Sequence, residues 1–315
     1  MWLFQNKSDF LKRMLIGIDY EIQRALVERS PMIYRRTNHQ NRKKEGVATA
    51  LYISYLGQEY ILTVAHTFQD YDFNSLFIDI VDIPLSDFKK GCIIYPPQKC
   101  NFKANDYCFL FVDDNMRSRL QEFFCPMPIP PDAKRGKIIE EMYFILGYPA
   151  TKNFGWTQPA NKEKIKTFRY CLHLPRENNN IYPENIIDYQ KNIILKYKKR
   201  VIPSENIFSR IRWLPPKLNG MSGCGIWTVV PYPLDINYKS KIIVDGTTIN
   251  IPPDYFITPH FSLQGMLTNY DKSKQRIIGF AIQNIIEAIE HINKCQCIQN
   301  TNAIITSNDC PDLFF

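Results

Sequence analysis

The stretch 218-LNGMSGCGIWTVV-230 places Ser222 among three glycines, directly before a run of residues that favour β-strands. Glycine adopts backbone conformations that other residues avoid, so the chain can bend closely around this serine. In the α/β-hydrolase turn, the serine lies in the pattern G-x-S-x-G and a helix follows it. Here position 224 is a cysteine, residues 226–230 have a strand pattern, and the lysine of a phosphate-binding loop is missing. The stretch therefore argues for a β-rich fold and against these two alternatives.

Short apolar segments separated by turn-forming residues recur along most of the chain. The segments with a strand pattern are 47–56, 60–65, 76–83, 91–95, 107–112, 142–148, 166–174, 192–197, 226–230, 241–244, 262–268 and 276–282. Such spacing is typical of a sandwich or barrel rather than of a parallel α/β sheet. Helical patterns occupy residues 9–16, 19–29 and 283–294, and the proline-containing stretch 113–137 is predicted to be a crossover between two β units.

The composition limits the partners that the chain can have. At ~100–200 residues per domain, 315 residues predict two domains or one large one. The net charge is +8, and basic residues gather in 35–44 and 194–200. A surface for nucleic acid or anionic lipid would be basic, but no nucleic-acid motif accompanies this charge. We therefore expect neither nucleic acid nor a membrane as partner.

The sequence predicts no leader, membrane span, metal or cofactor. The first fifteen residues are interrupted by charge, unlike the apolar run of a signal peptide, and no apolar run approaches the ~18 residues of a membrane span. The nine cysteines include no CxxC pair, so the spacing of a zinc site is missing. We expect a cytoplasmic protein with free thiols.

Two further stretches carry side chains that can act together with Ser222. His66 follows a predicted strand in 61-ILTVAHTF-68, and Asp106 opens the apolar strand 105-NDYCFLFV-112. Taken singly, each of the three residues has an ordinary structural interpretation, as a strand-end histidine, a turn aspartate or a loop serine. Taken jointly, the chain order His, Asp, Ser is that of the chymotrypsin arrangement and differs from the orders in subtilisins and α/β-hydrolases.

These stretches resemble the catalytic segments of the chymotrypsin/trypsin-like serine protease superfamily. ILTVAHTF resembles the segment L-T-A-A-H, NDYCFLFV resembles N-D-I-A-L-L, and NGMSGCGIW resembles G-D-S-G-G-P. Weaker similarities lie in 145-ILGYP-149, 265-GMLTNY-270 and the terminal helix, so the resemblance covers roughly residues 46–293. It implies two six-stranded antiparallel β-barrels, with an N-terminal helical extension and a C-terminal helix.

The resemblance also implies a division of the chain. Residues 1–45 would be a helical and basic extension, 46–135 the first barrel, 136–294 the second barrel with the terminal helix, and 295–315 a tail. The N-terminal helices would suit docking to a larger protein assembly.

The same resemblance assigns a role to each motif residue. Ser222 would be the nucleophile of a serine endopeptidase, His66 the general base and then the acid, and Asp106 the residue that orients His66. The backbone N–H groups of Gly220 and Ser222 would form the oxyanion hole.

A polypeptide substrate would lie along the segment near residue 268. Thr268, Asn269 and Tyr270 would edge the substrate cleft, where the substrate backbone can pair as an added strand. No acidic residue stands at Pro216 or Lys217, about where the floor of the primary pocket should be, so selection of arginine or lysine is not expected.

Two residues of the motif, and the function as a whole, leave alternatives open. The family's aspartate before the serine is Met221 here, so activation by an ion pair to a newly cut N-terminus is not expected. Cys224 is a less favoured alternative nucleophile. The alternative function is a catalytically inactive protease-like domain that binds peptides or proteins.

Overall fold

The protein is mostly β-structure. The computed structural model describes residues 25–36, 44–95, 106–131, 133, 142–150, 154–156, 168–173, 192–196, 218–233, 240–244, 247–251, 257–271 and 276–307. The helices among them are α2 (Thr67–Asp70), α3 (Asp114–Gln121), α4 (Ile282–Lys294) and α5 (Gln296–Gln299), with 3₁₀ turns at Phe73–Ser75 and Leu85–Asp87, and residues 25–27 are also helical. No helix in these ranges is both long and apolar enough to cross a membrane.

Two sheets form the first half of the fold. One has the order β11 (Phe154–Trp156), β2 (Lys44–Thr49), β1 (Met32–Arg36), β5 (Leu76–Ile78) and β6 (Ile83–Pro84). The other has the order β19 (Ile304–Thr306), β7 (Gly91–Ile94), β8 (Tyr107–Val112), β4 (Gln58–Thr63), β3 (Leu51–Tyr55) and β9 (Met127–Pro128). The chain passes from β2 to β3 through Ala50 alone. Apolar side chains of both sheets, among them Ile33, Ala48, Tyr52 and Leu110, meet in one buried cluster.

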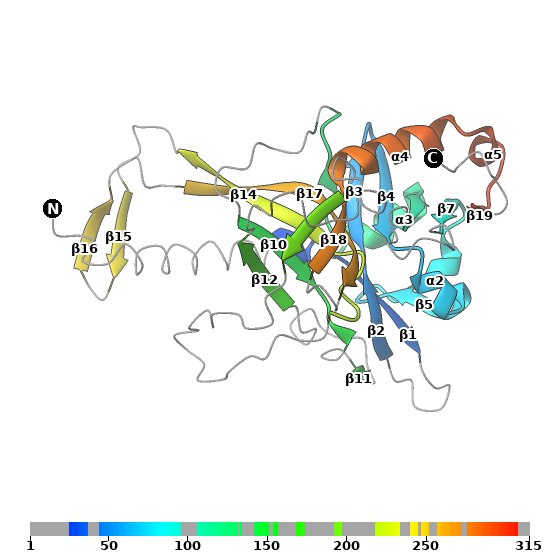
Figure 1. The fold of residues 1–315 in the computed structure, drawn as a ribbon, viewed down its shortest axis with the longest axis horizontal. Helices are drawn as coiled ribbons and strands as arrows, with labels where there is room; N and C mark the ends of the chain where they lie inside the picture. Colours follow the sequence, from blue (N-terminus) through cyan, green and yellow to red (C-terminus); the bar gives the residue numbers. More distant parts are fainter. Residues whose placement is uncertain are drawn as a thin grey trace.

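A third sheet forms the second half. Its order is β12 (Phe168–His173), β10 (Met142–Gly147), β14 (Gly225–Pro233), β17 (Ile257–Asp271), β18 (Arg276–Ala281) and β13 (Asn192–Lys196). β14 and β17 continue past the end of β10 as a two-stranded arm toward the hairpin of β15 (Ser240–Val244) and β16 (Thr247–Ile251) (Figure 1). Among the described residues these sheets are open rather than closed, so the two six-stranded barrels stay a prediction.

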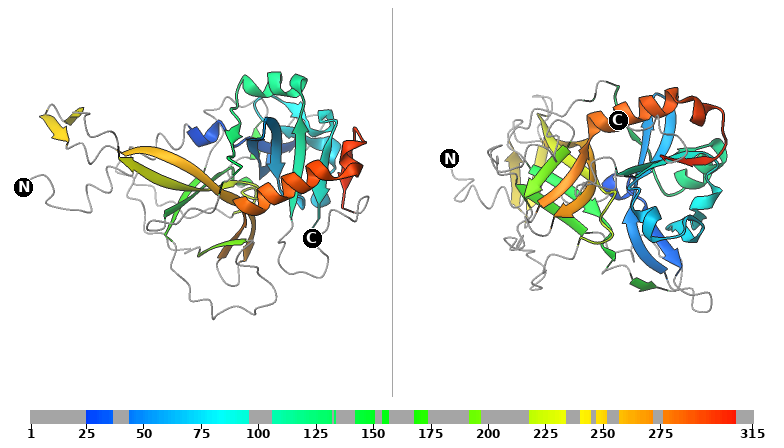
Figure 2. Two further views of the ribbon diagram at one scale, coloured as in Figure 1. Left: turned by 90° about the horizontal axis from the view of Figure 1, so that it is seen from above. Right: turned by 45° about the vertical axis from the view of Figure 1, so that its right-hand side comes forward.

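Helix α4 joins the two halves. The two groups of strands lie side by side, and α4 runs from the end of β18 across to the first group (Figure 2). Its apolar side of Ile285, Ile289 and Ile292 shares one core with β-strand residues of both halves. The hydroxyl groups of Tyr55 and Tyr60 bond to its polar side chains Glu290, at 2.7 Å, and Asn293, at 3.1 Å.

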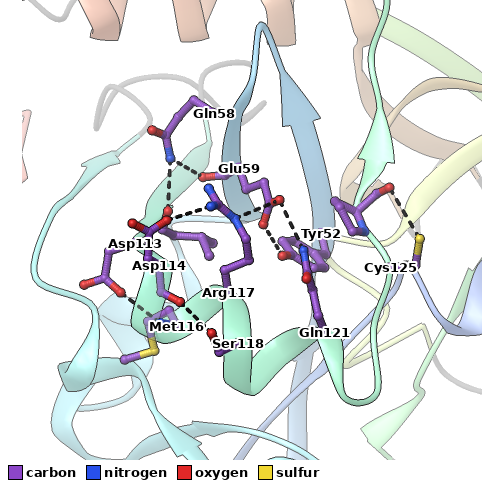
Figure 3. Close-up of polar contacts among 12 residues, drawn as sticks. Tyr52, Gln58, Glu59, Asp113, Asp114, Met116, Arg117, Ser118, Gln121 and Cys125 are labelled. Carbon is purple, nitrogen blue, oxygen red and sulfur yellow. Dashed lines mark hydrogen bonds and ion pairs between the residues drawn. The ribbon is translucent and has the colours of Figure 1, made fainter.

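Helix α3 is held against β3 and β4 by a polar network (Figure 3). Asp113 caps the helix, because its carboxylate accepts a 2.8 Å bond from the amide of Met116. Glu59 on β4 accepts a bond from the Tyr52 hydroxyl and pairs with Nε of Arg117 at 3.1 Å. The network compensates the charge of a carboxylate that is almost wholly buried.

Several sequence predictions differ from this structure. The predicted strand 76–83 is interrupted by a turn at 79–82, where Ile80 and Asp82 have positive φ. The stretch 113–137 contains helix α3, not only a crossover. The strand pattern also missed β1, which lies in the predicted helical and basic extension 1–45 and pairs with β2 and β5, and β19 in the C-terminal tail, which pairs with β7. The predicted strand 47–56 is divided between β2 and β3, which belong to different sheets, and β9, β11 and β16 were not predicted. The predicted terminal helix is confirmed as α4. Of the predicted helical segments 9–16 and 19–29, only residues 25–29 are described, and 25–27 of these are helical.

Candidate active site

His66 and Asp106 meet at the ends of two neighbouring strands. β4 pairs with β8, so the chain that leaves β4 toward His66 runs beside Asp106, which directly precedes β8. Oδ1 of Asp106 accepts a 2.8 Å bond from the backbone amide of His66, and Oδ2 lies 2.5 Å from Nδ1 of the imidazole ring. The Asp106 side chain is fully buried, whereas that of His66 is 21% exposed. The structure therefore brings together two residues that are forty positions apart.

This contact fixes the histidine for proton transfer. An ionised carboxylate can only accept hydrogen bonds, so Nδ1 of His66 is the donor in the pair. In the neutral ring the other nitrogen, Nε2, then carries a lone pair that can accept a proton. The backbone bond and the ring bond to one carboxylate together fix the orientation of the imidazole.

Ser222 lies in a tight turn of residues 218–224, called the Ser222 turn below. Two successive turn bonds shape it, from the Met221 amide to the Leu218 carbonyl at 3.0 Å and from the Cys224 amide to the Met221 carbonyl at 3.1 Å. Gly220 and Gly223 have φ values of +85° and +88°, which glycine adopts without strain. The glycines of the sequence motif thus stand where this backbone requires them.

Two buried threonines connect the Ser222 turn to the strand that precedes His66. The Thr49 amide donates to the Ser222 carbonyl at 2.9 Å, and the Thr63 hydroxyl donates to the Thr49 carbonyl at 2.8 Å. Thr63 ends β4 and stands three positions before His66. Among the described residues, no hydrogen bond joins the Ser222 side chain to His66; these backbone and threonine contacts bring their chain segments together.

The Ser222 turn presents two backbone amides without an acceptor. Within the described part of the chain, the N–H groups of Gly220 and Ser222 donate to no protein oxygen. The Ser222 side chain is partly exposed, whereas Gly220 is buried, and a Cβ atom there would lie 2.6 Å from the Ala150 amide nitrogen and 2.8 Å from the Tyr148 carbonyl oxygen. Two such amides beside a hydroxyl group are able to bind an oxyanion.

The segment predicted to edge a cleft is the end of β17. Its pairing with β14 ends at Met266, and its pairing with β18 continues to Asp271. Thr268 is buried at a β-bulge, and its hydroxyl donates to the Ile278 carbonyl at 3.2 Å. Asn269 and Tyr270 are partly exposed, so these two side chains, rather than that of Thr268, can contact a ligand.

Met221 and Cys224 point into the core of the third sheet. Both side chains are fully buried in an apolar cluster that includes Ile145, Ile226 and Leu267. Burial raises the pKa of the Cys224 thiol well above its ordinary value, so the nucleophilic thiolate is disfavoured. The structure therefore gives Met221 a packing role and gives Cys224 a poor position for a nucleophile. Pro216 and Lys217 lie outside the described residues.

The described side chains offer no site for a metal ion. No group of three or more His, Cys, Asp or Glu side chains in the described ranges could hold a metal ion. The sequence patterns also missed two residues whose hydrogen bonds hold the site together. The missed residues are Thr49, which lies in an ordinary strand pattern outside any motif, and Thr63, which lies in the motif 61-ILTVAHTF-68 but was assigned no role. Only their side-chain positions in the fold reveal them.

Neither a protein-family model nor a curated protein matches this chain at a significant level. The assignment of a function therefore depends on the geometry of the chain itself.

Proposed function

We propose that this chain is a serine endopeptidase of the chymotrypsin/trypsin-like type. The observation that carries the proposal is the pair of bonds from His66 to the buried Asp106, together with a glycine turn that holds the partly exposed Ser222 and whose Gly220 and Ser222 amides donate to no described protein oxygen. The chain order of these three residues supports the same assignment.

In the proposed reaction, Oγ of Ser222 attacks the carbonyl carbon of a peptide bond. Nε2 of His66 takes the hydroxyl proton, and Asp106 stabilises the imidazolium that forms. The amides of Gly220 and Ser222 bind the oxyanion of the tetrahedral intermediate. His66 then gives the proton to the leaving amine, and water hydrolyses the acyl-enzyme by the same steps in reverse order.

The polypeptide substrate is proposed to pair with the end of β17. Leu267 bonds through its carbonyl and amide to Gly223 and Cys224 of the Ser222 turn, and beyond it the described edge of β17 that faces away from β18 is not paired with β14. An extended peptide can add to such an edge through main-chain hydrogen bonds. Asn269 and Tyr270 would then contact substrate side chains.

The proposal includes the finer architecture that the resemblance implies. Two six-stranded antiparallel barrels would meet at the site, the first (46–135) with His66 and Asp106 and the second (136–294) with Ser222. Their contact through Thr49 and the core shared with α4 support this arrangement. The proposal also includes a reducing, cytoplasmic setting, which is supported by Cys92, Cys108, Cys125 and Cys224, because none of these four forms a disulfide in the described part of the chain.

A fluorophosphonate probe tests the activity directly. We expect the probe to label the folded wild type at Ser222 and not to label Ser222→Ala, with cleavage of a peptide library following the same pattern. Absence of both labelling and cleavage in a folded wild type would overturn the proposal and favour the alternative, an inactive protease-like domain that binds peptides.

A further inference from the structure

The peptide groups of the Ser222 turn are fixed through their carbonyl oxygens. The Asn219 carbonyl accepts a 2.8 Å bond from the amide of Ala150, and the Met221 carbonyl accepts one from Cys224. Because a trans peptide is planar, its N–H points away from its C=O. These two bonds therefore aim the amides of Gly220 and Ser222, which belong to the same two peptide planes.

The Gly220 and Ser222 carbonyl groups are both bound by a single residue, Thr49. Its hydroxyl donates to the Gly220 carbonyl at 3.0 Å, and its amide donates to the Ser222 carbonyl at 2.9 Å. The same hydroxyl accepts a 3.1 Å bond from the amide of Tyr148, so both its donor and an acceptor site are used. Thr49 is fully buried. It thus links the Ser222 turn to β2 and to the end of β10.

The Thr49 hydroxyl lies close against Gly147 and its carbonyl is also bound. A Cβ atom at Gly147 would lie 3.0 Å from the Thr49 hydroxyl oxygen and 3.0 Å from Sδ of Met221. The Thr49 carbonyl is in turn bound by the Thr63 hydroxyl. Met221 offers no charge to hold the turn, since its side chain lies in the apolar core. The contacts that remain to fix the turn are neutral hydrogen bonds, and Thr49 makes the two that come from the first half of the fold.

We propose that Thr49 is a positioning residue, whose hydroxyl and amide hold the Ser222 turn in the geometry that aims both amides at a reacting oxyanion. This inference rests on the proposed peptidase function. Thr49 contacts neither substrate nor the reacting atoms; it acts through the Gly220 and Ser222 carbonyl groups. The proposal predicts that the hydroxyl matters for the rate of reaction with Ser222 and not for substrate affinity.

The test compares Thr49→Val, Thr49→Ala and Thr49→Ser with the wild type. Valine keeps the volume of threonine without its hydroxyl, whereas alanine and serine differ from each other by the hydroxyl alone. We expect kcat and the rate of fluorophosphonate labelling to fall roughly 10- to 100-fold in the valine and alanine variants, since one oxyanion donor is worth roughly 100-fold or more. KM should be unchanged, and serine should restore most of the rate.

Tyr60→Phe is the matched control for the loss of a buried hydroxyl. Tyr60 bonds to Asn293 on α4, away from the Ser222 turn, so this variant should keep the wild-type kcat. Wild-type kcat in a folded Thr49→Val would overturn the proposal. Should the valine variant fail to fold, equal rates for the alanine and serine variants would overturn it instead.

Amide hydrogen exchange separates this inference from the peptidase proposal. Exchange in a peptide covering residues 218–226 should be faster in Thr49→Val than in the wild type and unchanged in Tyr60→Phe, whether or not the protein cleaves peptides. A wild type that the probe does not label would contradict the peptidase function alone. Unchanged exchange in Thr49→Val would contradict the positioning role of Thr49.

Discussion

The carbonyl oxygen of Thr49 occupies the space where a side chain at position 223 would begin. A Cβ atom at Gly223 would collide with this oxygen and would lie 2.6 Å from the Thr63 hydroxyl oxygen. The backbone of Thr49 and that of the Ser222 turn are therefore in direct contact at Gly223. This contact makes the glycine after Ser222 a requirement of the tertiary structure.

Gly223→Ala should destabilise the fold far more than Gly57→Ala. Both glycines have a similar positive φ, +88° and +82°, but a Cβ at Gly57 would meet no atom within 4 Å. Gly57→Ala should therefore lower the free energy of unfolding by only about 1 kcal/mol, because it strains the backbone alone. Gly223→Ala also overpacks the contact and should lower the free energy of unfolding by roughly 2–5 kcal/mol. Urea denaturation of both variants measures the difference, and equal losses would contradict the close contact.

Asp106→Asn should remove most of the proposed activity while the protein stays folded. An asparagine can still accept a bond from the His66 amide, but it can also place an N–H against Nδ1 and so favour the other tautomer. In a comparable triad this change lowers kcat about 10⁴-fold. We expect a loss of roughly that size in peptide cleavage, with near-native unfolding midpoints. Undiminished cleavage by this variant would exclude Asp106 from the mechanism.

The buried pair of Lys44 and Asp79 should make stability depend on pH. Lys44 Nζ lies 3.5 Å from Oδ1 of Asp79, and both side chains are almost fully buried. Desolvation raises the pKa of Asp79 above its ordinary value of 3.8 and lowers the pKa of Lys44 below 10.5, in each case against their mutual attraction.

The sign of this dependence follows from proton binding. Above pH 3.8 and up to its raised pKa, Asp79 binds more protons in the folded than in the unfolded state, so the unfolding free energy falls as the pH rises through this range. Asp79→Asn lacks this contribution. When both proteins are denatured at several pH values from about pH 4 to about pH 7, the free energy of unfolding should fall more steeply with pH in the wild type. Parallel curves would contradict the raised pKa of Asp79.

Ile289→Ala in α4 should cost about 2–5 kcal/mol of stability, the usual range for a buried isoleucine. Ile289 is fully buried in the core that both halves of the molecule share. Glu287→Ala on the exposed side of the same helix is the control and should change stability by less than about 0.5 kcal/mol. Thermal unfolding checks both, and a small effect of Ile289→Ala would argue against α4 as a common core element.

Cys224 should resist alkylation in the native protein. Its thiol is fully buried, and burial raises its pKa, whereas Cys125 and Cys297 are exposed. Iodoacetamide at about pH 8 should modify the two exposed thiols first, because the thiolate is the reacting form. Mass spectrometry of tryptic peptides reads out each site. Modification of Cys224 as fast as that of Cys125 would reopen the question of which residue is the nucleophile.

Local sequence patterns predicted most of the β-strands and the amphipathic helix α4, because period-two and period-3.6 apolar patterns report directly on burial. They failed at 79–82, where Ile80 and Val81 continue the apolar, strand-like run of residues 76–83. There the amide of Asp79 bonds to the Met32 carbonyl, and Lys44 pairs with Asp79 and Asp82. Those partners come from other strands, so the turn is invisible to a local pattern.

Helix α3 was missed for a different reason. It is short, and only Met116 and Leu120 of its residues are buried, so its apolar pattern is weak beside the prolines that follow. The feature of the sequence that could have indicated the start of this helix is the capping residue Asp113. The ion pair of Arg117 with Glu59 on β4 adds a tertiary contact that propensity does not contain.

The sequence by itself determined the β-rich class, the chain order of His66, Asp106 and Ser222, and the glycines that the Ser222 turn needs. Only the tertiary structure decided that the His66 ring contacts Asp106, that Met221 is core, and that Thr49 binds a carbonyl 171 positions away. The physical reason is the range of the interactions. Backbone freedom and apolar periodicity act between near neighbours in the chain, whereas hydrogen-bond partners are chosen by packing between strands that the sequence does not place side by side.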